Sequence, residues 1–431
     1  MEVKATDTHG TRRPRRHGFP LRWLFVAILL VLSILNYVDR QVLSILATTV
    51  QRELGLSDTD YARVGQAFFL CYTLAFLVSG RIVDRWGTRL PEALFATWWS
   101  VANMLTGLVG GFGTLALARG LLGLGEPGHF VASVKIIGQW FPARERGMAV
   151  GLVAMGGTVG AAIAAPLVAW LTLSYGWRSA FFVTGAVGLV FAAVWWLCYR
   201  PPGQHPWLGA KESQLLRDHH LLDAAPDAER PATFREVLGL KPLWVIMAVR
   251  CVTDPILFFY LIWFAKFLQE KRGFTLGEVG GKLWMVFLAA DIGCVLAGWL
   301  GGTLIRRGTE PVRARLRVMC GAAAVMALSF VAPLGGGTWA LAWASVLAGC
   351  AMLYMACCIA LPIDLFSTRS LGSIQGLIGA SSSLGGLVST GLVAAVIGKW
   401  SYDAVFISMS FLHPVATLAL VLLLPRLTRR A

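Results

Sequence analysis

The sequence predicts an all-α membrane protein in which twelve transmembrane helices form two pseudo-symmetric six-helix bundles. Of its 431 residues, 56% are hydrophobic and 14% are charged, whereas soluble proteins average about 25% charged residues. The apolar residues come in blocks of roughly 20, the length that a helix needs to cross a hydrocarbon core of about 30 Å. Helices satisfy their own backbone hydrogen bonds in lipid, so the repeated blocks predict a helical bundle.

Each apolar block marks one span, and a polar stretch separates the sixth span from the seventh. The expected spans are 22–47, 61–83, 90–111, 114–140, 148–173, 179–199, 243–268, 280–305, 316–334, 338–366, 372–397 and 403–425. The first block is too long for a signal-peptide core, so we expect a retained helix. The resulting segments are a tail at 1–21, a first bundle at 22–199, a linker at 200–242, a second bundle at 243–425 and a tail at 426–431.

The net charge of +15 is distributed unevenly along the chain. Most Lys and Arg residues fall in the two tails, in the linker and in the loops expected on the same side. The opposite loops hold few, among them Arg52 and Arg178. This bias follows the positive-inside rule and predicts that both termini are cytoplasmic. It argues against nucleic-acid binding as the reason for the basic composition.

The sequence contains no pattern typical of an enzyme, a metal site or a bound cofactor. The eight cysteines lie in apolar segments without metal-ligand spacing, and we expect them to pack as small apolar residues. The glycine-rich runs 151–160 and 372–391 lack the Gly-Lys-Ser/Thr of a phosphate loop and are expected to let helices approach closely. Energy for transport must then come from an ion gradient or from the gradient of the substrate.

Two loops echo each other between the halves. The loop after the second span reads Gly80-Arg-Ile-Val-Asp84-Arg85-Trp-Gly87-Thr-Arg89. The loop after the eighth span reads Gly301-Gly-Thr-Leu-Ile-Arg306-Arg307-Gly308, with Ile305 in place of the acid. Internal repeats of this kind predict a substrate site at the mid-membrane interface between the halves.

The first of these loops resembles the major facilitator superfamily, whose signature G-x-x-x-D-R-x-G-x-R it matches in full. We expect a cytoplasmic gate there, in which charge-assisted bonds at helix ends latch the two halves together. Its members are Gly80, Asp84, Arg85, Gly87 and Arg89. The alternative is a positively charged retention loop, which needs neither the acid nor both glycines.

Ionisable side chains inside a span are costly, so each is a functional hypothesis. The first and fourth spans carry Asp39, Arg40, Arg119, Glu126, His129 and Lys135. Arg119 and Glu126 are seven residues apart and therefore share a helix face. Because the two spans are antiparallel, Asp39, Arg40 and Arg119 are expected at a similar depth, with Glu126 nearer the midplane.

These charges suit the coupling of a proton to an anion. A carboxylate that pairs with Arg while ionised releases it when protonated. Protonation of Asp39 is expected to free an arginine, whose planar fork then binds a substrate carboxylate. The alternative is a structural network of ion pairs that fixes helix packing.

Three more residues are candidates for the site. His129 shares a face with Glu126 and is either a proton relay or a neutral hydrogen-bonding residue. Asp254, which precedes Pro255, marks an expected helix break in the seventh span. Asp291 in the eighth span is a further intramembrane charge, and Asp254 and Asp291 form a possible site in the second half.

Taken together, these residues resemble the anion:cation symporter branch of the superfamily, which includes bacterial hexuronate and galactonate transporters. The resemblance covers most of the chain. Its motifs are Asn36-Tyr37-Val38-Asp39-Arg40, Arg119-Gly-Leu-Leu-Gly-Leu-Gly-Glu126, Trp140-Phe141-Pro142-Ala143-Arg144-Glu145-Arg146, Thr253-Asp254-Pro255 and Ala290-Asp291-Ile292-Gly293.

The resemblance implies proton-coupled import of an organic anion, often a sugar acid, across a bacterial inner membrane. It gives proton-carrying roles to Asp39 and Glu126. It also implies that Arg40 grips the substrate carboxylate and that Arg119 pairs with the acid of the first span. Proton flux would then be linked to anion binding within the first bundle.

The same resemblance covers the substrate-lining positions less completely. Tyr37 and Tyr72 match aromatic hydroxyls that line the site. Sugar-acid members usually carry Asn in place of His129, and amide side chains in place of Ala154 and Thr158. A polyhydroxylated substrate needs many hydrogen-bonding partners in a dry site, so the anion handling is better supported than the sugar handling.

The sequence therefore predicts a symporter that imports a hexuronate or related sugar acid with protons, by alternating access and as a single chain. Its expected partners are a small organic anion, protons and the lipid bilayer, with the proton gradient as driving force and no cofactor. One alternative is a proton antiporter that exports drugs or organic acids, although the fifth span lacks the Pro of the Gly-Pro motif common in such antiporters. Another is a non-transporting sensor on the same scaffold, which the intact set of Asp39, Arg119 and Glu126 disfavours.

Overall fold

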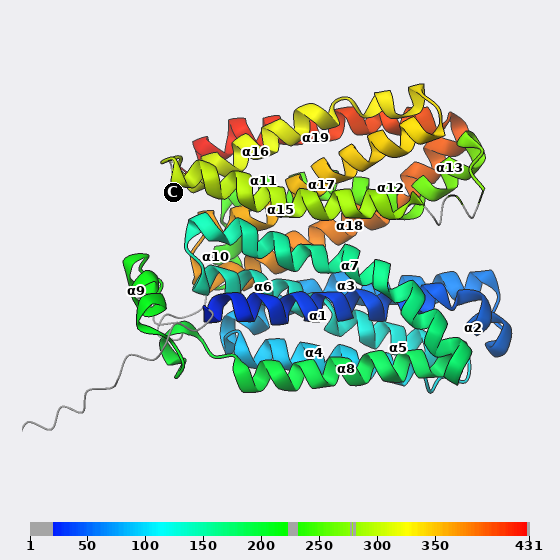
Figure 1. Ribbon diagram of the computed structural model, residues 1–431, viewed down its shortest axis with the longest axis horizontal. Coiled ribbons are helices and arrows are strands. Elements are labelled where there is room, and N and C mark those ends of the chain that lie inside the picture. The colour runs from blue at the N-terminus through cyan, green and yellow to red at the C-terminus, as the bar shows by residue number, and fades with distance from the viewer. Residues whose placement is uncertain (1–19, 223–231, 276–277, 279–281, 429–431) are drawn as a thin grey trace, which may run out of the picture.

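The computed structural model describes residues 20–222, 232–275, 278 and 282–428. The described residues form helices and connecting turns without a strand. Figure 1 shows two bundles of long helices lying side by side along the long axis of the molecule. Most of the expected tails 1–21 and 426–431, and part of the expected linker 200–242, lie outside the described residues.

The first bundle contains six spans. They are α1 (Leu21–Ile45), α3 (Asp58–Trp86), α4 (Arg89–Thr106), α5 (Phe112–Gly125) with α6 (Pro127–Trp140), α7 (Ala143–Tyr175) and α8 (Trp177–Cys198). A short helix, α2 (Ala47–Leu54), follows the first span. Each span overlaps the range expected from the apolar blocks.

The second bundle contains the remaining six spans. They are α11 (Lys241–Thr253) with α12 (Pro255–Ile262) and α13 (Phe264–Arg272), α15 (Trp284–Arg306), α16 (Pro311–Met326) with η2 (Ser329–Leu334), α17 (Gly337–Leu365), α18 (Leu371–Lys399) and α19 (Tyr402–Thr428). The turn η3 (Thr368–Ser370) leads into α18, and the linker carries η1 (Pro202–Gln204), α9 (Ala210–Asp218) and α10 (Phe234–Leu238). The predicted twelve-helix fold is confirmed.

Two spans are broken immediately after an acidic residue. Glu126 is the last residue before Pro127, and Asp254 is the last residue before Pro255. Proline lacks the N–H that would continue the helical hydrogen bonding, so each break follows from the sequence. The break at Asp254 is the predicted one, whereas the range 114–140 was expected to be one continuous helix.

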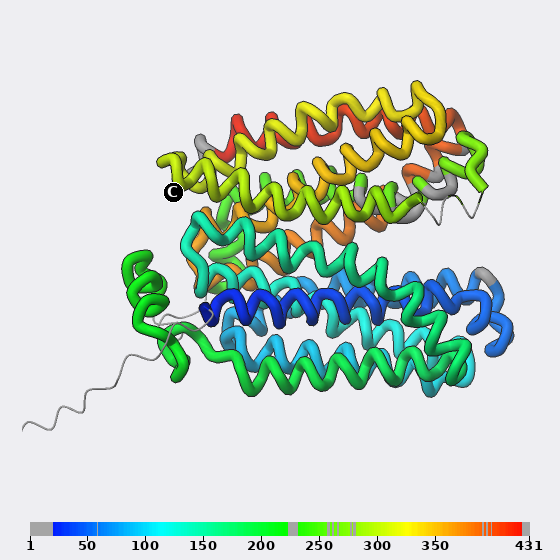
Figure 2. Tube along the Cα trace, in the orientation of Figure 1, coloured from blue at the N-terminus to red at the C-terminus, as the bar shows by residue number. Residues whose placement is uncertain are grey.

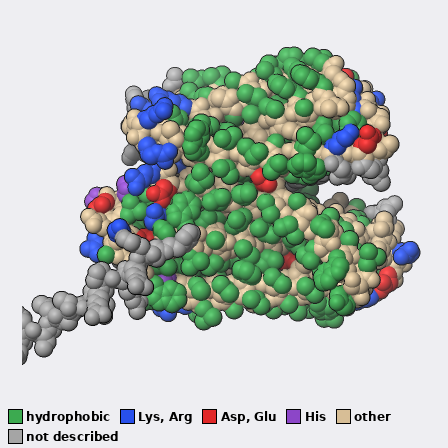
Figure 3. All heavy atoms as spheres, viewed as in Figure 1, with side chains coloured by type: hydrophobic (Ala, Val, Ile, Leu, Met, Phe, Trp, Pro, Cys, Tyr) green, Lys and Arg blue, Asp and Glu red, His purple; other side chains and the backbone are tan. Residues whose placement is uncertain are grey.

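The two ends of the molecule differ. In Figure 1, α1 begins at the left, where α9 and α10 also lie, and α2 lies at the opposite end. We call these the linker end and the α2 end. In Figure 2, the green segment that joins the two bundles lies at the linker end. Figure 3 shows charged side chains gathered at both ends, with a broad hydrophobic surface between them, as expected of a multi-pass membrane protein.

The bundles meet closely along two helix pairs, α7 with α15 and α3 with α18. A Cβ atom added at Gly80 would lie 2.4 Å from the carbonyl oxygen of Gly372. One added at Gly151 would lie 2.3 Å from the carbonyl oxygen of Cys294. Glycine at these positions lets the two backbones touch. Figure 3 shows a notch between the bundles at the α2 end.

Candidate functional site

Arg40 and Glu126 form a partly buried ion pair inside the first bundle. The Arg40 Nη2 lies 2.5 Å from Glu126 Oε2, and the Arg40 Nε donates to the same oxygen at 2.9 Å. The Glu126 carboxylate is fully buried, and its Oε1 has no protein hydrogen-bond partner. Charge-assisted bonds of this kind are stronger than neutral ones. The arginine expected to take the substrate carboxylate is therefore held by one of the two expected proton carriers.

Aromatic rings surround the Arg40 guanidinium. Its central carbon lies 4.9 Å from the ring centre of Tyr37 and 4.7 Å from that of Tyr72. The ring of Phe68 is 5.4 Å away. These cation–π contacts favour a partly desolvated arginine. The structure thus brings together three predicted residues, Tyr37, Arg40 and Tyr72.

Asp39 points to a different part of the bundle from Arg40. Its Oδ1 accepts a hydrogen bond from Asn103 Nδ2 at 2.7 Å, and Asn103 also bonds Thr184 at 2.8 Å. Consecutive helical residues project about 100° apart, so Asp39 faces α4 and α8 while Arg40 faces α5. The expectation that protonation of Asp39 frees an arginine is therefore corrected, because the acid that holds Arg40 is Glu126.

Arg119 lies beside this pair and, among the described residues, forms no ion pair within contact distance. Its Nη2 donates to the backbone carbonyl of Arg40 at 3.3 Å, and its Nη1 is buried without a protein partner. Within the described chain, no ion pair joins Arg119 to Asp39, which is the pairing implied by the resemblance. The pairing fails because the Asp39 carboxylate turns toward Asn103. Asn103 is a polar neighbour that the sequence reasoning missed.

His129 belongs to a separate buried cluster. Its Nδ1 lies 2.6 Å from Glu92 Oε1, and its Nε2 lies 2.8 Å from the Ser33 hydroxyl. All three side chains are fully buried. Glu92 was missed because an acid in the first turn of a helix is ordinary, and only its burial sets it apart.

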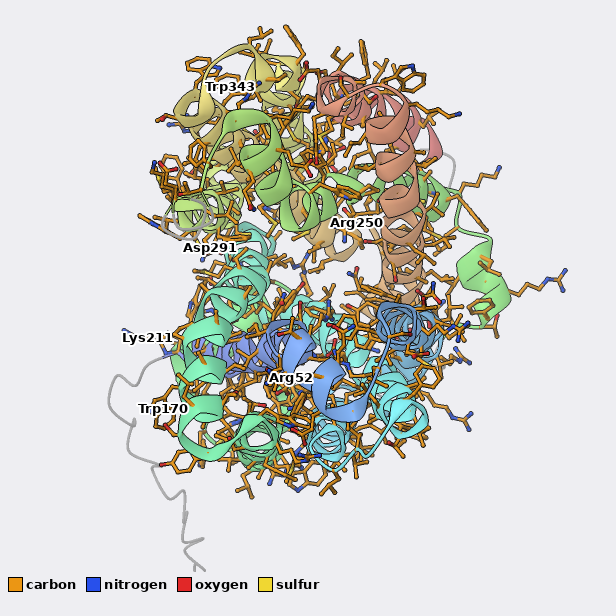
Figure 4. The ribbon with its side chains drawn as sticks, turned by 90° about the vertical axis from the view of Figure 1, so that its right-hand side faces the viewer. Arg52, Trp170, Lys211, Arg250, Asp291 and Trp343 are labelled. Carbon is orange, nitrogen blue, oxygen red and sulfur yellow. The ribbon has the colours of Figure 1, made fainter. Side chains whose placement is uncertain are left out.

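In the second bundle, Asp254 and Asp291 do not share a site. Asp254 pairs with Arg250 at 2.9 Å and accepts a hydrogen bond from Ser382. Asp291 instead accepts a hydrogen bond from Thr158, which belongs to the first bundle. Figure 4, seen from the α2 end, shows Asp291 at the boundary between the bundles.

A pocket of about 120 Å³ lies between the bundles near the Asp291–Thr158 contact. Tyr37, Gln41 and Thr158 line it from the first bundle, and Tyr260 and Phe287 line it from the second. Most of its other walls are apolar. Tyr37 therefore connects the pocket to the Arg40–Glu126 pair, because its ring lies against the guanidinium. This is the interface at which internal repeats place a substrate site.

Asp84 joins the bundles at the linker end. Its Oδ1 accepts from Lys135 Nζ at 2.8 Å and from the backbone N–H of Gly372 at 2.9 Å, and its Oδ2 accepts from Ser373 N at 2.7 Å. The carboxylate therefore caps the N-terminus of α18, where the helix dipole favours negative charge. Gly80 permits this approach because it touches the backbone of Gly372.

The arginines expected in this gate do not cross to the second bundle. Arg85 is exposed, since it projects away from the face that carries Asp84. Arg89 donates to the Trp196 carbonyl at 2.6 Å and lies over the Trp196 ring within the first bundle. Gly87 ends α3 with a φ of 76°, a conformation that favours glycine. The charge-assisted bonds at this end are those of Asp84 with Lys135 and the start of α18.

A second contact closes the linker end where Ile305 replaces the acid of the repeated loop. Asp364 accepts from Arg146 at 2.9 Å and from Arg315 at 3.2 Å. A Cβ atom at Gly147 or Gly301 would lie 2.3 or 2.5 Å from the Arg315 Nη1. These glycines make room for the buried guanidinium. Asp364 thus links α7 of the first bundle to α16 of the second.

Comparison with known proteins agrees with this arrangement. The model of the family "Major Facilitator Superfamily" matches residues 29–336. The galacturonate transporter of Dickeya chrysanthemi is 32% identical over 281 residues, which cover 65% of this chain and 81% of that protein. The hexuronate transporter of Escherichia coli (strain K12) is 28% identical over 392 residues, which cover 90% of each protein.

Solved structures show the same fold at low sequence identity. The proton:xylose symporter XylE bound to 6-bromo-6-deoxy-D-glucose has a TM-score of 0.75 and 14% identity, and the match covers 93% of this chain and 95% of that one. FucP in the outward conformation has a TM-score of 0.72 and 14% identity, with coverage of 93% and 98%. Since the family match spans more than half of the chain, this protein belongs to the major facilitator superfamily of membrane transporters and is not an enzyme.

Proposed function

We propose that this protein is a symporter that imports an organic anion, a hexuronate or a related sugar acid, together with protons by alternating access. The observation that carries the proposal is the Arg40–Glu126 pair, in which the arginine best placed for a carboxylate is held by a buried acid. The names of the relatives support the substrate class, because galacturonate and hexuronate are sugar acids with one carboxylate.

Coupling follows from the competition for Arg40. While Glu126 is ionised, it occupies the guanidinium with two hydrogen bonds. Protonation removes its charge and weakens its hold on Arg40. The fork of Arg40 is then available to a substrate carboxylate, which it matches in shape and charge. Proton and anion therefore bind together, and loss of the anion favours return of Arg40 to an ionised Glu126.

Asp39 is proposed as the second proton-carrying acid. It is fully buried, and its Oδ2 has no protein partner. Its Oδ1 is tied to Asn103 rather than to an arginine. Protonation of Asp39 therefore acts on the packing of α1 against α4 and α8 rather than on the grip of Arg40.

The pocket between the bundles suits the hydroxylated part of a sugar acid, which extends from its carboxylate. Tyr37, Gln41, Thr158 and Tyr260 provide polar groups at its walls. The Tyr260 hydroxyl is buried and has no protein partner. Unpaired polar groups of this kind favour a hydroxylated ligand over an apolar one, because a ligand hydroxyl satisfies them.

Alternating access requires the linker end to open. The contacts that Asp84 makes with α18 and that Asp364 makes with Arg146 hold that end closed in this arrangement. We propose that the linker end is cytoplasmic, because the basic loops lie there and follow the positive-inside rule. In this view the protein resides in a bacterial inner membrane with both termini inside and works as a monomer.

Proton flux in proteoliposomes tests this function. Vesicles carry the purified protein and an internal pH dye, and receive glucuronate, galacturonate, galactonate, glucarate or simple carboxylates from outside. The expected result is lumenal acidification with one or more sugar acids. Labelled acid that moves without acidification contradicts proton symport, and alkalinisation favours the antiporter.

A further inference from the structure

A row of buried polar side chains extends from the Arg40–Glu126 pair toward the linker end. His129 follows Glu126 by three residues, just beyond the break at Pro127. Its two ring nitrogens face different partners, Glu92 at 2.6 Å and Ser33 at 2.8 Å. An imidazole between two polar groups can accept a proton on one nitrogen and release one from the other. The proposed coupling mechanism uses neither His129 nor Glu92.

Beyond Glu92, the row of polar side chains continues through Thr88 toward the linker end. Thr88, at the start of α4, hydrogen-bonds the Tyr199 hydroxyl at 2.9 Å and donates to Gln139 at 3.2 Å. The backbone N–H of Glu92 bonds the Thr88 carbonyl, so the two residues are one turn apart. A pocket of about 160 Å³ reaches Thr88, Lys135 and Gln139. Glu92 therefore lies one helical turn from a hollow at the linker end.

A further buried polar side chain, that of Asn36, lies on the side of His129 that leads toward Glu126. Asn36 lies on α1 between Ser33 and Arg40, at the three- and four-residue spacings that share a helix face. Both polar atoms of its side chain are buried without a protein partner, as is Glu126 Oε1. Buried polar atoms of this kind are commonly bridged by ordered water. Glu126 Oε1 and the Asn36 side chain are thus available to bind ordered water between Glu126 and His129.

Few other charged groups border the pair of Glu92 and His129. The rings of Trp99 and Phe130 pack against the His129 imidazole at 5.8 and 5.3 Å between centres. Tyr199 of α8 lies close enough to interact electrostatically with Glu92. Lys135 pairs with Asp84, and the acid that contacts the His129 ring is Glu92.

We propose that His129 and Glu92 form a proton-release relay inside the first bundle, separate from the pocket between the bundles. The inference rests on the proposed proton symport. The Glu126 carboxyl gives its proton to His129 Nε2, and His129 gives the proton on Nδ1 to Glu92 Oε1. Glu92 then releases a proton toward the hollow at the linker end. After the transfer the imidazole carries its proton on Nε2, and a turn of the ring points this N–H at Glu92 and the bare Nδ1 at Glu126, so that each cycle moves one proton.

The relay is interrupted in this arrangement. Within the described chain, no hydrogen bond joins Glu126 to His129, and the Glu126 carboxylate turns toward Arg40 instead. The interruption coincides with the closed linker end. If Glu126 and His129 come into contact only after the bundles rearrange, the proton is released at the linker end during the transport cycle. Protons then do not leak through the relay while the linker end is closed.

The test compares two fluxes in proteoliposomes that carry the unaltered protein, Glu92→Gln or His129→Asn. The first flux is substrate-driven acidification, which needs proton release at the linker end. The second is counterflow of a labelled sugar acid at equal pH on both sides, which exchanges substrate without net proton release. Ser133→Ala is the matched control, since its hydroxyl is buried one turn from His129 but bonds only the His129 backbone carbonyl.

We expect both relay variants to lose about 100-fold in acidification, the lower end of the range for loss of a proton-transferring group, while counterflow stays within about twofold. The control keeps both fluxes. If both fluxes fall together, or neither falls, Glu92 and His129 are structural and the relay is wrong. If the unaltered protein shows counterflow without acidification, proton symport itself is wrong, and that result is separate from any effect of the variants.

Discussion

Arg40 and Glu126 are 86 residues apart in sequence, yet the arginine directs its Nε and Nη2 at one carboxylate oxygen. The rings of Tyr37, Tyr72 and Phe68 surround the Arg40 guanidinium, and Tyr37 also lines the pocket between the bundles. The second carboxylate oxygen has no protein partner. In the proposed mechanism, Arg40 is therefore the group for which ionised Glu126 and a substrate carboxylate compete.

Replacing Arg40 with Lys is expected to weaken uptake. Lysine keeps the charge but cannot present a planar fork to a carboxylate. Loss of one charge-assisted hydrogen bond costs about 1.5–3 kcal/mol, so the apparent KM is expected to rise roughly tenfold or more. Initial rates of labelled-acid uptake measure this change. An unaltered KM would move the carboxylate contact to another residue, with Arg119 as the nearest candidate.

Replacing Asp84 with Asn is expected to open the linker end. The neutral amide loses the charge-assisted bonds to Lys135 and to the first turn of α18. Spin labels at the exposed positions Leu197 and Arg313, one on each bundle, report the separation by double electron–electron resonance. The distance distribution should shift to longer values. Arg85→Gln is the matched control because Arg85 belongs to the same loop but is exposed, and an equal shift there would argue against the latch.

Replacing Asp364 with Asn is expected to destabilise the fold. It leaves the buried guanidinium of Arg315 without its carboxylate and also removes the partner of Arg146. Breaking a buried ion pair typically costs about 3–5 kcal/mol. Thermal unfolding in detergent should show a clear decrease in Tm. Glu310→Gln, which affects only the exposed pair with Arg313, should leave the Tm nearly unchanged.

Glu53 at the end of α2 is expected to give a pH-dependent stabilisation. Arg178 and Trp177 donate hydrogen bonds to its carboxylate and hold its pKa below the usual value. A lowered folded-state pKa stabilises the fold above the unfolded pKa, and that contribution is lost as the pH falls through the folded pKa. The Tm of Glu53→Gln should therefore be slightly lower than that of the unaltered protein at pH 7, and the gap should vanish as the pH falls below the folded-state pKa of Glu53. A Tm difference that persists at low pH would mean that Glu53 stabilises the fold by packing rather than by its charge.

The membrane-spanning fold is largely predictable from the sequence. Apolar blocks of span length identify all twelve spans, because burial in lipid requires them irrespective of their neighbours. The break at Pro127 was also available, since Glu126-Pro127 repeats the acid–proline order of Asp254-Pro255. It was missed because the apolar residues continue through it without a gap.

The pairing of the charged side chains is less predictable. Asp39 and Arg40 are neighbours in sequence, but their partners depend on how α1 is rotated against α4, α5 and α8. Apolar patterning says which segments enter the membrane, and it does not specify which faces meet. For the same reason, the capping of α18 by Asp84 and the Glu92–His129 contact emerge only from the folded arrangement.

The most direct test of the account is the pH dependence of sugar-acid binding by the Glu126→Gln variant, measured by calorimetry in detergent beside the unaltered protein and Asp39→Asn. Binding to the unaltered protein should weaken as the pH rises, because ionised Glu126 reclaims Arg40. The Glu126→Gln variant should bind tightly at every pH, whereas Asp39→Asn should keep the pH dependence. A Glu126→Gln variant that retains the pH dependence of the unaltered protein would contradict the coupling of proton to anion through Arg40.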